Sequence, residues 1–156
     1  GAPRELYEVV LAAQLASLEV CQPGATLVQI HEAAVAALVE GMVAVGLLTG
    51  DPAELIEKEA YRSYYMHNTS HWLGLDVHDV GTYTEGGKPR PLEAGMVFTI
   101  EPGLYIPEDD EEADPAFRGI GVRIEDDVLV TEDGIENLTE AIPKGIAEVE
   151  AWVNGP

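Results

Sequence analysis

Three of the chain's four histidines lie in one short stretch, MHNTSHWLGLDVHD, as His67, His71 and His78. If this stretch is an extended strand, His67, Thr69 and His71 share one face, because side chains alternate along a strand. Strict alternation would place His78 on the opposite face, and a bend or bulge at Gly74 would bring it back. A lone histidine in a strand is usually structural, whereas three close together favour a metal-binding or catalytic site.

Two glutamates stand in apolar, strand-like surroundings where a bare carboxylate is costly to bury. Glu101 follows the letters VFTI and shares its expected strand face with Thr99, and Glu125 lies two positions from Arg123. The ordinary explanations are that Glu101 faces water on an edge strand and that Glu125 forms an ion pair with Arg123. The alternative is a cation site. One imidazole and two carboxylates form a ligand set suited to Mn²⁺, Co²⁺ or Zn²⁺.

Helices are predicted near the start of the chain and at its end. Apolar residues recur at helical spacing over 5–21, and the letters QPG end that pattern. Thr26 is a suitable N-cap for a second helix over 27–46, whose wide apolar face predicts deep burial. Residues 49–58 form a short linking segment with room for one helical turn. Residues 146–152 are predicted to form a short helix.

From residue 61 onward the sequence favours strands. They are expected at 97–100, 103–106 and 121–131, and a hairpin turn is expected at 132–134. Helices followed by antiparallel strands indicate the α+β class. Alternation in the third strand predicts that the apolar residues share one face and the charged residues the other: Val122, Ile124, Val128 and Val130 against Arg123, Glu125 and Asp127.

The chain has the length and composition of one globular domain and carries a large negative charge. It contains 156 residues, of which 29 are acidic and 8 basic, for a net charge of −21. Nucleic acid is excluded as a partner, because its phosphates would be repelled. We expect a solvated acidic surface that includes the loop over 107–117. Salt would relieve the repulsion within such a surface, as in proteins adapted to high salt.

Several other classes are disfavoured by the sequence. No window approaches the ~18 uninterrupted apolar residues of a membrane helix, and the first residues lack the pattern of a signal peptide. We therefore expect a cytoplasmic protein with no membrane partner. The single cysteine, Cys21, cannot form an internal disulfide and is expected in the core. The fourth histidine, His31, is expected to be structural or merely exposed.

Three long blocks of the sequence resemble one family closely. HNTSHWLGLDVHDVG, LEAGMVFTIEPGLYIP and GIGVRIEDDVLVTEDGIENLT are similar to Xaa-Pro aminopeptidase (aminopeptidase P), and the resemblance runs from the first helix to the end of the chain. It implies the pita-bread (creatinase/aminopeptidase) fold, in which helices pack on a curved antiparallel sheet. It also implies a metal-dependent exopeptidase that releases the N-terminal residue preceding proline, acting on peptides with proline at the second position.

The resemblance implies a pair of divalent metal ions bridged by a hydroxide, with Mn²⁺ the expected metal and Co²⁺ or Zn²⁺ as alternatives. By position, His71, Glu101 and Glu125 correspond to metal ligands. Glu125 would bridge both ions, and Glu101 would also handle the proton of the attacking water. Two such ions acidify a bridging water and polarise the scissile carbonyl.

The resemblance also assigns residues that act on the substrate. His67 would contact the substrate near the proline, and His78 would support the tetrahedral intermediate. Arg123 would hold the ligand shell in place, and Tyr105 would be a further hydrogen-bond donor beside it. Histidines at these positions can donate hydrogen bonds to the oxyanion that develops.

Two departures from the family pattern are visible. Asn68 stands where the family usually has glycine, and asparagine tolerates a left-handed backbone. The family's five metal ligands include two aspartates on a hairpin before the first helix, in an Asp-x-Thr-Arg-like run that this sequence lacks. We therefore expect residues 1–156 to be the C-terminal portion of the catalytic domain, with that ligand hairpin and the family's N-terminal domain absent.

These departures shape what is expected of the chain itself. A site with three of five ligands should hold cations weakly, so low metal occupancy and no activity are expected of this chain alone. Uncovered apolar surface predicts a homo-oligomer. Two other functions are considered: a non-catalytic pita-bread module that binds peptides or proteins, and a sibling enzyme such as an Xaa-Pro dipeptidase or a creatinase.

Overall fold

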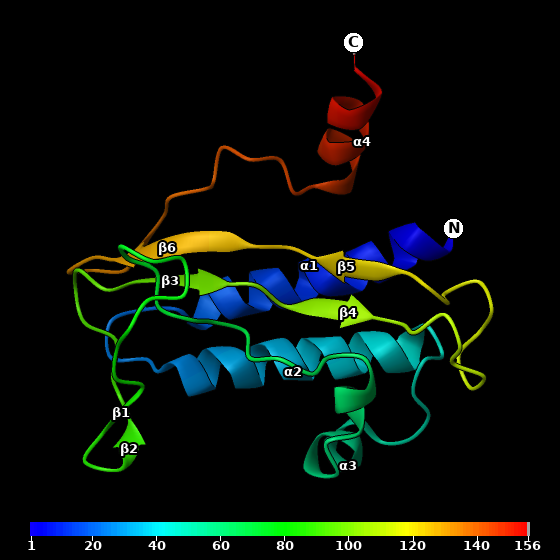
Figure 1. Ribbon diagram of the computed structural model, residues 1–156, viewed down its shortest axis with the longest axis horizontal. Helices are drawn as coiled ribbons and strands as arrows, with labels where there is room; N and C mark the ends of the chain where they lie inside the picture. Colours follow the sequence, from blue (N-terminus) through cyan, green and yellow to red (C-terminus); the bar gives the residue numbers. More distant parts are fainter. Residues whose placement is uncertain (156) are drawn as a thin grey trace.

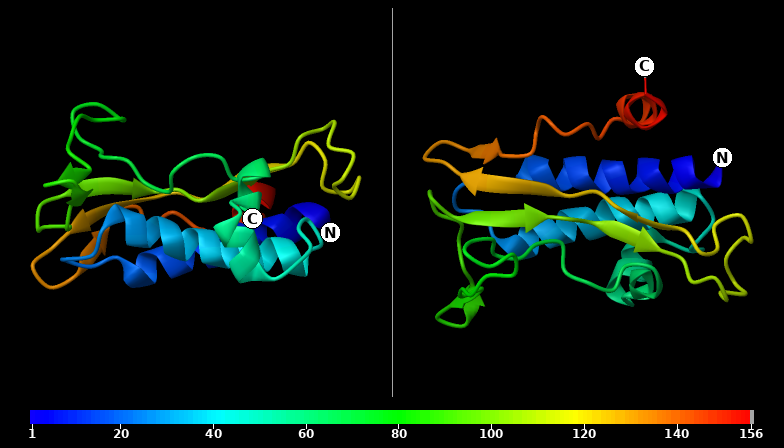
Figure 2. Two further views of the ribbon diagram at one scale, coloured as in Figure 1. Left: turned by 90° about the horizontal axis from the view of Figure 1, so that it is seen from below. Right: turned by 45° about the horizontal axis from the view of Figure 1, so that its top comes forward.

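A computed structural model describes residues 1–155, which form two layers. Two long helices, α1 (Ala2–Val20) and α2 (Leu27–Ala44), lie side by side and cover one face of a set of strands (Figures 1 and 2). Both predicted helices are confirmed. Helix α1 begins earlier than the predicted residue 5, because Pro3 is well placed in the first turn of a helix, where its missing N–H is not needed.

Helix α2 is a central element of the core. Its N-terminus is capped reciprocally: Gln29 N donates to Thr26 Oγ1 (3.2 Å) and Thr26 N donates to Gln29 Oε1 (2.9 Å), which confirms Thr26 as the N-cap. By length and composition alone this helix is apolar enough to cross a bilayer. In this fold it packs along α1, and the buried face that explains its composition comprises Ile30, Ala34, Val35, Leu38, Val39 and Met42.

The strand pairs within residues 1–155 are all antiparallel, and together with the helices they confirm the α+β class. Strands β3 (Val97–Ile100) and β4 (Gly103–Tyr105) follow each other in one line, and β6 (Asp126–Val130) and β5 (Gly121–Arg123) lie beside them (Figure 1). Strand β7 (Ile135–Asn137) completes the order β3-β6-β7, after the hairpin turn predicted at 132–134.

The predicted strand over 121–131 is two strands, interrupted at Ile124 and Glu125. Its alternation is nevertheless confirmed, since Ile124, Val128 and Val130 are buried, Val122 is half-buried, and Arg123 and Glu125 are exposed. The two strands that pair with them, β3 and β4, are interrupted at the same place. Ile100 pairs with Asp126 and Gly103 pairs with Arg123, so no residue is inserted on either side and Glu101 is opposite Glu125.

The stretch with the histidines differs from the predicted run of strands. Residues 60–63 form a short 3-10 helix, η1 (Ala60–Ser63), because Tyr61, Tyr64 and Tyr65 are spaced to bury one face of a helical turn against the core. Residues 69–73 are extended beside β3 and share three backbone hydrogen bonds of 2.7–3.1 Å with residues 97–101. The sequence-based start of the strands at residue 61 is therefore wrong, and regular pairing begins later.

The smaller elements surround this frame. Helix α3 (Pro52–Glu57) is the predicted short helical segment, capped by the Asp51 carboxylate. Strands β1 (Thr84–Glu85) and β2 (Lys88–Pro89) form a hairpin that the sequence reading did not anticipate. Helix α4 (Ile146–Asn154) confirms the C-terminal helix and carries Trp152 with 67% of its surface exposed. The acidic loop over 107–117 is largely solvated, although Ala113 and Phe117 are buried in it.

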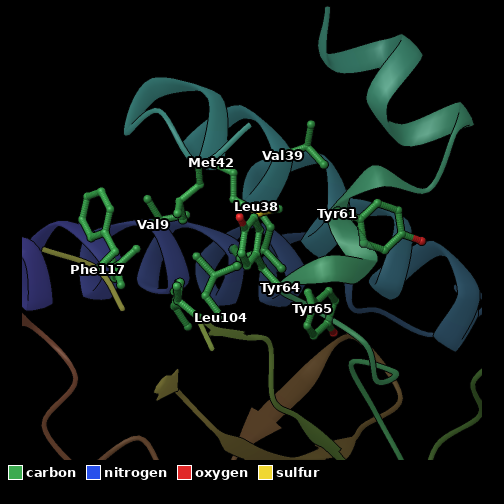
Figure 3. Close-up of a cluster of buried hydrophobic side chains, with 14 of the residues drawn as sticks. Val9, Leu38, Val39, Met42, Tyr61, Tyr64, Tyr65, Leu104 and Phe117 are labelled. Atoms are coloured by element: carbon green, nitrogen blue, oxygen red, sulfur yellow. The ribbon is translucent and has the colours of Figure 1, made fainter. Parts of the chain in front are cut away.

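Most of the core lies between the two long helices and the strands. One cluster gathers side chains from α1, α2, η1 and β4, among them Val9, Leu38, Met42, Tyr64 and Leu104 (Figure 3). A second cluster surrounds β3 and β6 and includes Cys21, as predicted, and Trp72. Burial raises the pKa of the Cys21 thiol to about 12, so the thiol stays protonated and inert.

Candidate metal centre

The three predicted metal ligands converge on one point of the sheet. His71 comes from the extended segment beside β3, Glu101 follows β3, and Glu125 lies between β5 and β6. One ligand atom from each lies within 4.8 Å of the other two. Donors bound to one ion at about 2.1 Å are separated by roughly 3–4 Å, so small side-chain rotations would suffice to place a divalent ion among them.

The hydrogen bonds of His71 prepare it to bind a cation. Its Nδ1 lies 2.9 Å from the carbonyl oxygen of Trp72, which can only accept, so Nδ1 carries a hydrogen. The other nitrogen, Nε2, faces Glu101 Oε1 at 3.0 Å. A lone pair on neutral Nε2 and a carboxylate oxygen can approach this closely only with a proton or a metal ion between them. A second partner on Nδ1 is the usual arrangement of a metal-binding histidine.

Glu101 is held from both sides and has only 7% of its surface exposed. Its Oε1 accepts a hydrogen bond from Thr99 Oγ1 (3.0 Å), as expected for residues that share a strand face. Its Oε2 forms an ion pair with Arg123 Nη1 (3.2 Å). The expectation of a water-facing edge residue is therefore wrong. The ion pair of Arg123 is with Glu101 and not with Glu125, because cross-strand register brings Glu101 near the guanidinium.

The third ligand, Glu125, lies in a negative environment. Burial raises the pKa of its carboxyl group, and the charges of Glu101 and Asp127 raise it further. The opposing effects of His71 and Arg123 are smaller. A cation bound beside Glu125 would relieve the repulsion that raises the pKa of its carboxyl group.

Two of the predicted substrate-binding residues, His67 and Tyr105, form a hydrogen-bonded chain with Arg123 beside this cluster. His67 Nδ1 lies 2.8 Å from the Asn68 carbonyl and therefore donates to it. Tyr105 OH accepts from Arg123 Nε (2.7 Å) and lies 2.8 Å from His67 Nε2, to which its own hydrogen can be donated. The hydrogen bond that Arg123 donates to Tyr105 is the main reason that the pKa of Arg123 is raised. These hydrogen bonds thus fix the orientation of His67 and Arg123 together.

His78 reaches the same site, as the sequence predicted, through a folded loop. Its ring centroid lies 4.3 Å from that of His71. The Asp79 carboxylate accepts from Leu75 N (3.1 Å) and lies so close to Gly74 that a side chain there would force the carboxylate to move. The bend expected at Gly74 is therefore present and returns the loop to the site.

One expectation for this stretch is wrong. Thr69 does not share a face with the two histidines: it is fully buried and its Oγ1 contacts His31 Nδ1 (2.8 Å) and Tyr65 OH (2.7 Å) on the helix side. His31 is therefore half-buried with a packing partner, in line with a structural role. Asn68 has no left-handed backbone, since within residues 1–155 only Glu59 among the non-glycine residues has a positive φ.

Most of the predicted residues, but not Glu125 or Tyr105, line an open cavity of about 400 Å³ on the sheet. Tyr83 forms one wall and stacks on Trp72 at a centroid distance of 5.5 Å. Neither aromatic residue was anticipated as part of the site. The other lining residues include His67, Ser70, His71, His78, Glu101 and Arg123.

Asp126 is a further residue that sequence reasoning missed. It is 1% exposed, and its carboxylate accepts from Lys144 Nζ (2.6 Å), Thr139 Oγ1 (2.7 Å) and Gln14 Nε2 (2.8 Å). These bonds tie helix α1 and the segment after β7 to the residue next to Glu125. The alternation of strand 121–131 placed Asp126 on the buried face with Ile124, and this signal was available in the sequence.

Comparison with known proteins decides the family. The model of metallopeptidase family M24 matches residues 1–132. The chain belongs to family M24. Xaa-Pro aminopeptidase of Haemophilus influenzae is 50% identical to this M24 chain over 151 residues, which cover 97% of this chain and 35% of the relative.

Solved structures of M24 peptidases share its fold. Aminopeptidase PepP of Pseudomonas aeruginosa superposes with a TM-score of 0.94 at 51% identity, over 96% of this chain and 34% of that one. Aminopeptidase P of Escherichia coli with the inhibitor Pro-Leu superposes with a TM-score of 0.90 at 48% identity, over 96% and 34%. The predicted pita-bread fold is confirmed. The M24 chain spans about a third of the length of the relatives it matches.

Proposed function

We propose that this chain supplies His71, Glu101 and Glu125 to a two-metal centre, with Mn²⁺ as the metal, in a peptidase that releases the N-terminal residue preceding proline. The observation that carries the proposal is the convergence of the three donor groups within 4.8 Å. It occurs in a chain that is 50% identical to an Xaa-Pro aminopeptidase. A module that only binds peptides would not need an imidazole and two carboxylates held in this way.

The residues of the site suit hydrolysis of a peptide bond. Bound divalent ions would acidify a water molecule and polarise the scissile carbonyl. Glu101 would take up the proton of that water, and its contacts with Arg123 and Thr99, which hold its two oxygens, support this role. Carboxylates fixed by neighbouring donors lose little entropy in the reaction.

The histidines would bind the substrate on either side of the ligands. His78 lies at the exposed mouth of the cavity, where an imidazole N–H can donate to the carbonyl oxygen under attack. His67, fixed by Tyr105, is placed to contact the proline side of the bond. A bond before proline has no N–H, so an apolar contact there would favour proline over residues whose N–H would be buried without a partner.

The test is Mn²⁺-dependent release of the first residue from Ala-Pro-Gly, with Ala-Ala-Gly as the comparison substrate. We would assay this chain alone and the protein expressed from its complete reading frame. Activity is expected only from the second, because the resemblance implies five ligands. Glu101→Gln should lower kcat by about 10²-fold or more. Glu93→Gln, at an exposed surface ion pair, is the matched control and should leave kcat unchanged.

Several results would count against the proposal. Turnover that persists in a metal chelator, or survives Glu101→Gln, would contradict the metal centre. Equal cleavage of Ala-Pro-Gly and Ala-Ala-Gly would contradict the preference for proline. Calorimetric titration with Mn²⁺, Co²⁺ and Zn²⁺ would identify the metal, and the tightest binding is expected to require all three of His71, Glu101 and Glu125.

A further inference from the structure

A second cavity adjoins the metal-centre cavity and has no role in the chemistry described above. Its volume is about 240 Å³, several times the roughly 30 Å³ that a water molecule occupies. The two cavities share Asn68, Ser70 and Tyr83 as wall residues. A ligand bound at the metal centre can therefore extend into the second cavity along this shared wall.

One wall of the second cavity contains a hydroxyl group without a partner. Ser70 is 9% exposed, and within residues 1–155 its Oγ is buried and makes no hydrogen bond. Buried polar groups are nearly always hydrogen-bonded, because an unpaired one costs roughly 1–3 kcal/mol. A polar group on a bound ligand would satisfy this hydroxyl.

His31 supplies the second polar group of the cavity. The phenol of Tyr65 is a better donor than the hydroxyl of Thr69, so the hydrogen bonds run from Tyr65 OH to Thr69 Oγ1 and from Thr69 to His31 Nδ1. This direction leaves the hydrogen of His31 on Nε2. Burial, and then the nearby positive charge of Arg62, lower the pKa of His31.

The remaining surface of the cavity is uncharged and, apart from Asn68 and Thr69, mostly apolar. Leu27 and Val28, from the first turn of α2, face Pro89 of the β1–β2 hairpin and the Tyr83 ring. The described lining residues include no Asp, Glu, Lys or Arg. A charged side chain would lose its hydration there without meeting a counter-charge, whereas a neutral side chain with an aliphatic stem would be accepted.

We propose that this second cavity is a specificity subsite for the side chain of the residue that follows the proline of the substrate, and that it prefers neutral side chains of leucine or glutamine size. The inference rests on the proposed function. An aminopeptidase of this kind cleaves after the first residue, so a cavity beyond the metal centre meets the part of the peptide that leaves. An amide side chain such as that of glutamine would pair with both Ser70 and His31.

The experiment measures binding of leaving peptides and does not depend on turnover. Affinities of Pro-Gly, Pro-Leu, Pro-Gln and Pro-Glu are determined by calorimetry on the protein expressed from its complete reading frame, in one Mn²⁺ buffer. Pro-Leu and Pro-Gln are expected to bind about tenfold tighter than Pro-Gly, as burial of most of one such side chain implies. Pro-Glu should bind no tighter than Pro-Gly.

Variants of the cavity separate its apolar and polar parts. Val28→Trp should fill the cavity and abolish the advantage of both Pro-Leu and Pro-Gln over Pro-Gly. His31→Phe and Ser70→Ala should each lower the affinity for Pro-Gln to that for Pro-Gly. Pro-Leu should still bind these variants more tightly than Pro-Gly. Leu15→Trp, which also introduces a tryptophan but at an exposed apolar position of α1, is the control and should retain both advantages.

The subsite is disproved if the wild type binds all four dipeptides equally, if Pro-Glu binds as tightly as Pro-Gln, or if Val28→Trp keeps the preference. The proposed function is tested separately, by turnover of Ala-Pro-Gly, because the glycine of this substrate does not reach the cavity. Mn²⁺-dependent turnover of Ala-Pro-Gly without any preference among the dipeptides overturns the subsite alone. Absence of that turnover overturns the proposed function.

Discussion

Glu101 and Glu125 face each other across two antiparallel strand lines, at the step where both lines are interrupted. A regular strand pair would tolerate two opposed carboxylates poorly, since like charges directly opposite each other destabilise a sheet. Here Arg123 pairs with Glu101, and the pKa of Glu125 is raised by burial and by the charge of Glu101. Repulsion between the two carboxylates thus remains in the sheet, and a divalent cation bound between them would remove it.

Arg123→Met is expected to lower kcat/KM for Ala-Pro-Gly by about tenfold or more, because Glu101 Oε2 loses the group that orients it. Affinity for Mn²⁺ should change less, since loss of orientation and loss of a nearby positive charge act in opposite directions. Steady-state kinetics and Mn²⁺ calorimetry check both. Arg62→Met removes an exposed arginine and serves as control. Unchanged turnover in Arg123→Met would show that Glu101 does not need this partner.

Tyr105→Phe removes the hydroxyl that links Arg123 Nε to His67 Nε2. We expect kcat/KM to fall by about tenfold, with most of the effect in KM if His67 acts by holding the substrate. In the wild type, nitrogen NMR of His67 should show the hydrogen on Nδ1. Tyr7→Phe, which also removes one hydroxyl hydrogen bond, is the comparison variant. Equal kinetics for the two variants would contradict a positioning role for Tyr105.

Lys144→Met should destabilise the fold by about 3 kcal/mol, because it leaves the buried carboxylate of Asp126 without its cation. Lys58→Met is the matched control: that lysine pairs with Glu54 at the surface, with 68% of its side chain exposed, and should matter little. Urea denaturation of both variants measures the difference. A loss in Lys144→Met no larger than in Lys58→Met would refute the importance of the buried pair.

The same network predicts the response of stability to acid. Burial alone would raise the pKa of Asp126, but hydrogen bonds from Lys144 and Thr139, and further bonds from Gln14 and Asn137, outweigh it and lower the pKa from 3.8. A lowered folded-state pKa stabilises the fold above the unfolded-state pKa and loses that contribution as pH falls through the folded-state value. Urea denaturation below about pH 4 should therefore show a steeper loss of stability in the wild type than in Asp126→Asn.

The net charge of −21 predicts that salt stabilises the fold. Raising NaCl from about 0.1 M to about 1 M shortens the screening length from about 10 Å to about 3 Å, so repulsion between surface carboxylates weakens. The melting temperature should rise over this range. KCl should act like NaCl, and a chelator in all samples excludes binding of divalent ions as the cause. A flat or falling melting temperature would contradict the prediction.

Much of the fold could be predicted from local pattern. Helical spacing located α1 and α2, the cap at Thr26 fixed the start of the second, and alternation assigned the faces of residues 122–130. The glycines at 86 and 87, both with positive φ, lie in the turn of the β1–β2 hairpin. A Gly-Gly pair is a known hairpin signal, so this hairpin could have been predicted from the sequence.

The parts that could not be predicted depend on register. Spacing alone favoured an ion pair between Arg123 and Glu125, two positions apart on one strand. The observed partner, Glu101, is a neighbour across the strands, and pairing register is absent from a single sequence. Thr69 also left its predicted face because His31 and Tyr65 bind it from the other side. The grouping of the three predicted ligands came from family resemblance; that they bind metal stays a prediction.

The placement of the two tryptophans gives the molecule a built-in optical probe. Trp72 is 8% exposed, stacks on Tyr83 and directly follows His71, whereas Trp152 is largely exposed on α4. Once Trp152 is replaced by phenylalanine, the remaining indole emission comes from a side chain beside the metal centre. Quenching of that emission by paramagnetic Mn²⁺ would then follow occupancy of the site in real time, without a label.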